Sequence, residues 1–168
     1  AIGYGLGTRD IETGALPWQT VDQLHRSILD SLLPTYHLEA LTEDQRTHLN
    51  LAWHRLTPWP DSVEGLTKLK KHHTIATLSN GNIELLTNMA QHANLPWDHI
   101  LSAELFRHFK PHPDVYLGAA HHLNLYPNQL LMVATHAGDL RAAARQGLRT
   151  AYIPRPLEHG PDRPQPGK

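Results

Sequence analysis

The chain has 168 residues, 40% hydrophobic and 18% charged, with a net charge of −1 and an isoelectric point near 7. Such a chain can form one core with a small helical appendage, and its balanced charge without a basic block argues against nucleic-acid and membrane-surface binding. The absence of cysteine excludes disulfides, thiolate metal sites and a cysteine nucleophile. This composition fits a cytoplasmic chain. No signal peptide and no apolar run of the roughly 18 residues of a membrane span are found, so a spanning helix is excluded.

The fourteen histidines are the unusual feature of the composition. Adjacent pairs, such as His72 with His73 and His121 with His122, direct their side chains apart, which is poor geometry for holding a metal. We expect solvated surface histidines throughout, with His136 as the exception. No metal and no cofactor are predicted.

The first 58 residues are expected to contain helices and no strand. Residues 1–18 are rich in glycine and have neither helical nor strand periodicity, which predicts a loop. Two helices should follow, over 20–33 and from 42 to about 56, because each begins with a threonine that has a glutamine three residues later, as in a capping box.

After a proline-containing break at 57–62, the pattern alternates between helices and strands. Helices are predicted at 63–71, 82–93, 113–123 and 138–146, a turn near 127–129, and strands at 74–79, 99–103, 130–135 and 149–153. This alternation predicts an α/β fold with a parallel sheet covered by helices on both faces. The expected domains are a helical segment at 1–58, an α/β core at 59–156 and a proline-rich tail at 157–168.

Small polar residues follow the strand expected at 74–79. Ser79 and Asn80 come where the strand stops, and the amides of Gly81 and Asn82 begin the next helix. Amides at a helix N-terminus attract anions, so these residues are candidates for an anion site. The alternative is a simple capping turn.

Two further segments place charged groups beside helix starts. Lys110 precedes a proline and then a helix, where it can be a fixed positive charge or an exposed lysine, and Tyr116 can hydrogen-bond in the same place or pack. Asp139 and His136 follow the strand expected at 130–135, where Asp139 can act in a site or only cap the helix.

Taken together, these segments resemble the second, third and fourth motifs of the haloacid dehalogenase superfamily. The matching residues are Ser79-Asn80-Gly81, Lys110-Pro111 and the stretch at 133–156, and the nearest group is the L-2-haloacid, or type II, dehalogenases. The resemblance implies a Rossmann-like parallel-sheet core with an N-terminal helical cap domain, to which LPW, LHR and LNLAWHRLTPWPD at 16–61 are similar.

The resemblance also implies roles for the catalytic residues. Ser79 would bind the substrate carboxylate, and Lys110 would hold the charge of the nucleophile. Asp139 would pair with Lys110 and help to orient the attacking group or water.

The remaining implied residues border the substrate. Asn80 would contribute to the halide pocket, Tyr116 would line the substrate site, and His136 would lie near the leaving group. Ala134 replaces a serine of the relatives, and Thr135 is the hydroxyl that can compensate.

The implied reaction is removal of halide from a small 2-haloalkanoic acid through an aspartyl ester that water hydrolyses. The family's first motif, a strand ending in the nucleophilic aspartate, is not found, because Asp10 follows GLGTR without an apolar strand. The halide-binding arginine is not found either. We therefore expect a partial core that was cut before the catalytic strand and is inactive as it stands. A homodimer is left open.

Two alternatives are retained. One is a magnesium-dependent small-molecule phosphatase of the same superfamily, although Thr135 would then stand where a metal-binding acid is needed, and hard cations prefer carboxylates. The other is a non-catalytic remnant that keeps the fold, which the missing nucleophile favours.

Overall fold

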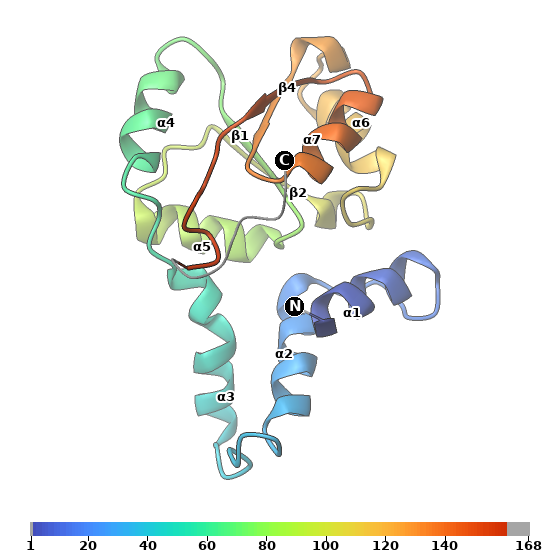
Figure 1. Cartoon of the computed structure of the whole chain (residues 1–168), viewed down its shortest axis with the longest axis vertical. Helices are drawn as coiled ribbons and strands as arrows, with labels where there is room; N and C mark the ends of the chain where they lie inside the picture. The colour runs from blue at the N-terminus through green and yellow to red at the C-terminus, as the bar shows by residue number, and fades with distance from the viewer. Residues whose placement is uncertain (1, 161–168) are drawn as a thin grey trace. The chain divides into compact units, whose positions relative to one another are not determined.

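The computed structural model describes residues 2–160, and the chain packs as two compact units that divide between Phe109 and Lys110 (Figure 1). The first unit contains α1 (Ile2–Glu12), α2 (Val21–Leu32), α3 (Glu43–Asn50), η1 (Leu51–Arg55), α4 (Ser62–Lys70), β1 (Ala76–Ser79), α5 (Ile83–Ala93), β2 (His99–Ser102) and η2 (Ala103–Leu105). The second contains α6 (Pro113–His122), η3 (Pro127–Gln129), β3 (Leu131–Ala134), α7 (Ala137–Arg145) and β4 (Arg149–Tyr152). The predicted order of helices and strands after residue 20 is confirmed.

Helices α2 and α3 run antiparallel in the first unit, as Figure 1 shows. Both predicted capping boxes are present. The Thr20 hydroxyl accepts a hydrogen bond from the Gln23 amide at 3.3 Å, and the Gln23 side chain accepts from the Thr20 amide at 2.8 Å. Thr42 and Gln45 repeat the arrangement at the start of α3. Each box satisfies amides that have no partner within the helix.

The prediction of a loop at the N-terminus is wrong for residues 2–12, which form α1. Glycine disfavours helices by about 1 kcal/mol per residue relative to alanine. Here, however, glycines allow α1 to approach α2 closely. A Cβ atom on Gly7 would lie 2.9 Å from Cδ2 of Leu24, and one on Gly3 would lie 3.2 Å from Cγ1 of Ile28. Tertiary packing therefore outweighs the weak local preference.

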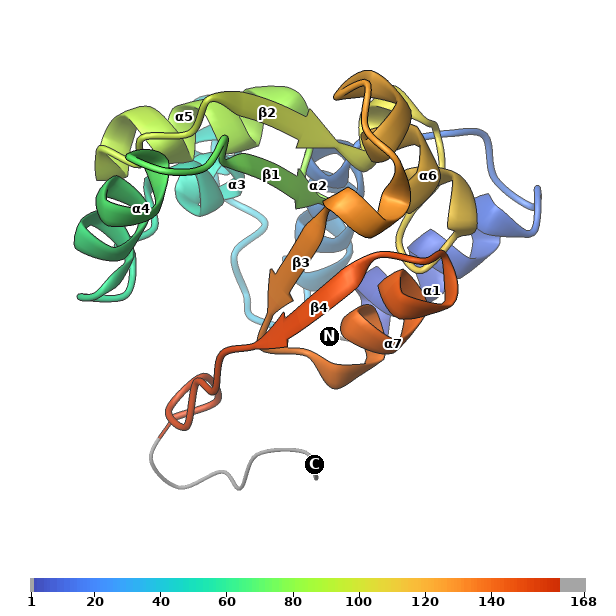
Figure 2. The same cartoon turned by 90° about the horizontal axis from the view of Figure 1, so that it is seen from above.

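Strands β1 and β2 form a two-stranded parallel sheet with α5 as the connection between them (Figure 2). The register pairs Ala76 with His99 and Ser79 with Ser102, so the polar ends of both strands lie at the same edge. Helix α5 packs against β2 and ends at Asn94, whose φ of 52° is left-handed. This sheet brings Ser79 and the residues after Ser102 together.

In the second unit, β3 and β4 form another parallel pair, with Leu131 opposite Arg149 and Ala134 opposite Tyr152. Helix α7 packs against both strands. The predicted α/β fold with parallel strands is confirmed, although the strands of residues 2–160 do not form one continuous sheet. The strands in residues 2–160 pair in two separate sheets, and Leu131 and Val133 are exposed. Alternate side chains of a strand point to opposite faces, so one face of β3 is left open.

The compact units divide at 109–110, so the N-terminal helices and the β1–β2 sheet lie in one unit. The domain boundary predicted at residue 58 stays a prediction. Most of the expected proline-rich tail, 161–168, lies outside the described residues. Within residues 2–160, no helix is both long enough and apolar enough to cross a membrane.

Candidate functional site

The loop that joins β1 to α5, residues 79–82, carries the first group of predicted site residues. Ser79 ends β1, and its hydroxyl accepts a hydrogen bond from the Gly81 amide at 3.1 Å. The Asn80 side chain hydrogen-bonds the hydroxyl of Tyr4 on α1, while burial raises the pKa of that tyrosine. Sequence analysis missed Tyr4 because it treated residues 1–18 as a loop. Ser79 and Asn80 are partly accessible, as a binding role requires.

A carboxylate of the protein already lies at the N-terminus of α5. Glu104 Oε2 accepts a hydrogen bond from the Ile83 amide at 2.7 Å. The Ser102 hydroxyl donates to the Gly81 carbonyl at 2.7 Å and accepts from the Glu104 amide at 3.0 Å. At the Gly81 amide the structure favours the capping turn, because this amide donates to the Ser79 hydroxyl. A negative charge at a helix N-terminus is favourable, and Glu104 supplies it here.

Lys110, Asp139 and Tyr116 form a compact cluster in the second unit. The Lys110 Nζ atom lies 2.6 Å from Asp139 Oδ2, and the Tyr116 hydroxyl donates to Asp139 Oδ1 at 2.7 Å. The side chains of Lys110 and Asp139 are each 16% exposed. The expected pairing of these two residues is thus present, and Tyr116 both packs and forms a hydrogen bond.

Burial and the neighbouring Asp139 carboxylate raise the pKa of Tyr116 far above its usual value. The phenol therefore remains protonated and works as a hydrogen-bond donor, since a phenolate beside a carboxylate would be a buried pair of like charges. The cluster can hold a carboxylate ionised and oriented while Lys110 supplies a fixed positive charge.

His136 is the N-cap residue of α7, and its ring is largely accessible to solvent. Its Nε2 atom lies 2.6 Å from Glu158 Oε1, a partner that sequence analysis did not find because it is 22 residues away. Thr135 follows the end of β3 and is partly exposed. Their proposed contacts with substrate stay predictions.

One histidine in the first unit is buried, contrary to the prediction that His136 would be the exception. His54 in η1 is 4% exposed, and its Nε2 atom lies 3.0 Å from Asp22 Oδ2. Its other ring nitrogen, Nδ1, lies 2.9 Å from the side-chain Nδ2 atom of Asn88. The sequence around His54 gives no signal of this, since the histidine and its partners are 32 and 34 residues apart.

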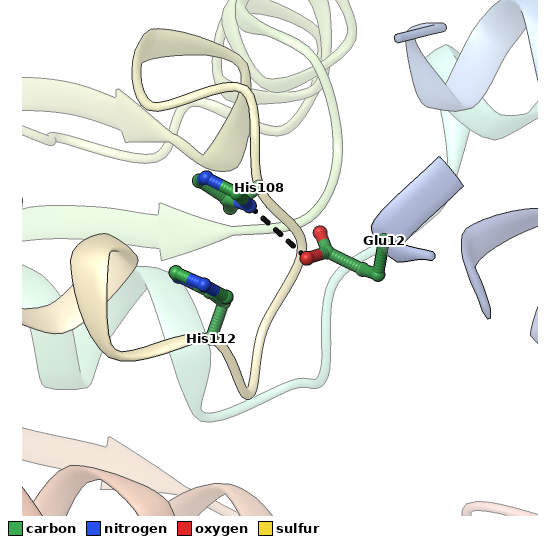
Figure 3. Close-up of side chains that lie close together, drawn as sticks. All are labelled: Glu12, His108 and His112. Atoms are coloured by element: carbon green, nitrogen blue, oxygen red, sulfur yellow. Dashed lines mark hydrogen bonds and ion pairs between the residues drawn. The ribbon is translucent and has the colours of Figure 1, made fainter. Parts of the chain in front are cut away.

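Glu12 links the end of α1 to the last residues of the first unit. Its Oε2 atom lies 3.0 Å from Nδ1 of His108 (Figure 3). Its Oε1 atom accepts a hydrogen bond from the Phe109 amide. Phe109 also stacks on Trp18, with ring centroids 4.7 Å apart. His112, also drawn in Figure 3, belongs to the second unit, where its side chain accepts from the Asp114 amide and caps α6. The Glu12 contacts hold the end of α1 against the last residues of the first unit.

Comparison with known proteins gives consistent results. A family model described as haloacid dehalogenase-like hydrolase matches residues 5–147. The (S)-2-haloacid dehalogenase 4A of Burkholderia cepacia is 36% identical over 141 residues, covering 82% of this chain and 59% of that protein. The (S)-2-haloacid dehalogenase 1 of Pseudomonas sp. (strain CBS-3) is 35% identical over 136 residues, covering 79% and 60%. The chain thus spans about three fifths of the length of these relatives.

Solved structures agree. The L-2-haloacid dehalogenase PA0810 matches 98% of this chain and 70% of its own, with a TM-score of 0.95 and 46% identity. The defluorinating L-2-haloacid dehalogenase Rha0230 matches 96% and 67%, with a TM-score of 0.93 and 43% identity.

Proposed function

Because the chain belongs to the haloacid dehalogenase-like hydrolases, we propose that the whole protein removes halide from small 2-haloalkanoic acids. The names of the relatives support this activity, since the similar proteins are (S)-2- and L-2-haloacid dehalogenases. The Lys110–Asp139–Tyr116 cluster carries the proposal within the molecule, because it provides a fixed cation and an ionised, oriented carboxylate. Such an arrangement suits chemistry in which a carboxylate is the nucleophile.

The proposed reaction has two steps. An aspartate carboxylate attacks the carbon that bears the halogen, so that a C–O bond forms, the carbon–halogen bond breaks and halide leaves with the bonding electrons. Water then attacks the ester, which releases a 2-hydroxy acid and regenerates the carboxylate. Among residues 2–160 no strand ends in aspartate, and Asp10 lies within α1, so we assign the nucleophile to none of the described residues.

Residues of this chain take the supporting roles. Lys110 keeps the nucleophile ionised, and Asp139 holds Lys110 and helps to orient the attacking water. Ser79 binds the substrate carboxylate, and Asn80 receives the halide with a side chain that Tyr4 fixes by a hydrogen bond. The donors are preorganised, so they need not reorient as charge develops on the leaving group.

Tyr116, His136 and Thr135 complete the proposal. Tyr116 acts through Asp139, while His136 and Thr135 contact the substrate side. We propose chemistry without a metal or cofactor, because Thr135 stands where the related phosphatases need an acid, and a hard cation prefers carboxylates. The names of the relatives do not favour a phosphatase. A cytoplasmic protein that binds no nucleic acid completes the proposal, and a homodimer is compatible with it.

The test is to extend the chain with the part of the Burkholderia cepacia relative that it does not cover and to measure chloride release from 2-chloropropionate. We expect release by the extended protein, none by the 168-residue chain, and loss of release after Ser79→Ala. Lys71→Ala is the control, because Lys71 is exposed and lies outside the cluster. Steady release by the chain without the added segment would show that the nucleophile has been misassigned.

A further inference from the structure

We propose that Asp22 and His54 are positioning residues that hold the loop at 79–82 against the N-terminal helices and thereby set the geometry of Asn80. The contacts that support this inference all lie in the first unit. The role of Asn80 in binding the halide rests on the proposed function.

Asp22 lies in the first turn of α2 and is the centre of a buried polar network. Its carboxylate oxygens lie 3.1 and 3.0 Å from Nε2 of His54, and its Oδ2 atom accepts a hydrogen bond from the side-chain Nδ2 atom of Asn82 at 2.8 Å. The backbone takes part as well. The Asp22 amide donates to Asn82 Oδ1 at 3.3 Å, and the Asp22 carbonyl accepts from the Asn50 side chain at 3.1 Å.

The orientation of the His54 ring follows from its two partners. The Asn88 side chain donates to Nδ1 at 2.9 Å, so Nε2 carries the proton and donates to Asp22. His54 is 4% and Asp22 17% exposed, so water provides little substitute for these bonds. The network therefore joins α2, η1 and α5 in one relative arrangement.

Asn82 connects this network to the candidate site. It is the N-cap residue of α5, yet its side chain makes no capping hydrogen bond to that helix. Asparagine is a favoured N-cap because its side chain can accept from the amides of the first turn. Here the side chain is used for Asp22 instead, and Glu104 accepts from the Ile83 amide. The Asn82 side chain therefore links α5 to α2 and does not cap α5.

The loop is thus held on two sides. Ser102 and Glu104 fix it from the end of β2, through the Gly81 carbonyl and the Ile83 amide. The N-terminal helices fix it from the other side, through Asp22 to Asn82 and through Tyr4 to Asn80. Removing the Asp22 carboxylate would loosen the side of the N-terminal helices, where the Tyr4 contact remains, so we expect Asn80 to shift while the strand end stays folded.

The experiment uses the isotopically labelled 168-residue chain and compares Asp22→Asn with Asp30→Asn by NMR. Asp30 is the matched control, because it lies on the same helix and its carboxylate pairs with Arg26 at 2.8 Å rather than with α5. We expect Asp22→Asn to shift the amide signals of residues 79–81 and to speed the exchange of the Nε2 proton of His54, because a neutral amide is a weaker acceptor than a carboxylate. Asp30→Asn should leave both unchanged. Unmoved signals for residues 79–81 in a folded Asp22→Asn protein would overturn the inference.

A second variant, Asn88→Ala, tests the inference if Asp22→Asn does not fold. Asn88→Ala removes only the donor to His54 Nδ1 and leaves the Asp22 carboxylate in place, so it should shift the same loop signals by a smaller amount. No shift in this variant would also count against the inference.

In the extended, active protein, Asp22→Asn should lower kcat far more than it raises KM for the haloacid, because Asn80 acts on the departing halide. The decrease in kcat can reach about a hundredfold if Asn80 moves by about 1 Å. With kcat expressed per folded molecule, a variant that only destabilised the fold would leave both constants unchanged. If the loop signals respond but the extended protein releases no halide, the proposed function fails and the positioning of the loop stands. If halide is released with kcat per folded molecule unchanged by Asp22→Asn, the proposed function stands and the positioning role fails.

Discussion

Removing the amino group of Lys110 should destabilise the chain and abolish turnover in the extended protein. Lys110 lies 2.6 Å from Asp139, and both side chains are largely buried. In Lys110→Ala the Asp139 carboxylate keeps the Tyr116 hydroxyl as a donor and loses the lysine ammonium as its cationic partner. A carboxylate in that environment must either recruit water, take up a proton or remain poorly compensated.

The magnitude follows from the geometry. Unit charges at 2.6 Å attract each other by about 6 kcal/mol at an effective dielectric constant of about 20, and desolvation of both ions offsets much of this. Deleting one partner of a fully buried pair costs about 3–5 kcal/mol. Because each side chain is 16% exposed and the Tyr116 hydrogen bond remains, we expect a loss of about 2–3 kcal/mol in the free energy of unfolding.

The assay is urea denaturation of the chain, with Lys68→Ala and Lys71→Ala as controls. Lys68 also forms an ion pair, with Glu64, but both side chains are at least 70% exposed, so its removal should cost no more than about 1 kcal/mol. Lys71→Ala should stay within about 0.5 kcal/mol of the parent. Equal denaturation midpoints for Lys110→Ala and Lys68→Ala would refute the reasoning from burial. An active extended Lys110→Ala protein would remove the cluster from the proposed mechanism.

Three further predictions concern pH and the start of α5. Folding raises the pKa of Tyr116, so this tyrosine contributes fully to stability below pH 10.0, the pKa of an unfolded tyrosine, and the contribution is lost as pH rises towards the pKa in the folded protein. In a spectroscopic pH titration above pH 10.0, Tyr116→Phe should therefore lose stability less steeply than the parent chain. The Asp98 carboxylate accepts from the Ile75 amide and pairs with Lys70, which lowers its pKa, so its contribution is present above pH 3.8 and is lost as pH falls below it. Asp98→Asn should therefore flatten acid unfolding, and unchanged acid unfolding would contradict this. Glu104→Gln keeps an acceptor for Ile83 but removes the charge at the helix N-terminus, so thermal unfolding should show a loss of about 0.3–1 kcal/mol, whereas a gain would contradict the role given to that charge.

Local patterns in the sequence determined most of the secondary structure. The capping boxes at Thr20 and Thr42 are made by residues three apart, so the sequence contains all the atoms of the interaction. Strand and helix alternation after residue 70 likewise depends on neighbouring side chains. The Lys110–Asp139 pairing was expected only from the resemblance to a family, since the two residues are 29 apart in the chain.

Only the tertiary structure decided which long-range partners meet. It turned the glycine-rich residues 2–12 into a helix, because Gly3 and Gly7 allow close packing on α2. It buried His54 between Asp22 and Asn88, and it placed Glu104 at the start of α5. In each case the residue contacts a partner at least 17 positions away in the sequence, and the free energy of that contact depends on burial. Burial is a property of the folded chain, so no local pattern contains it.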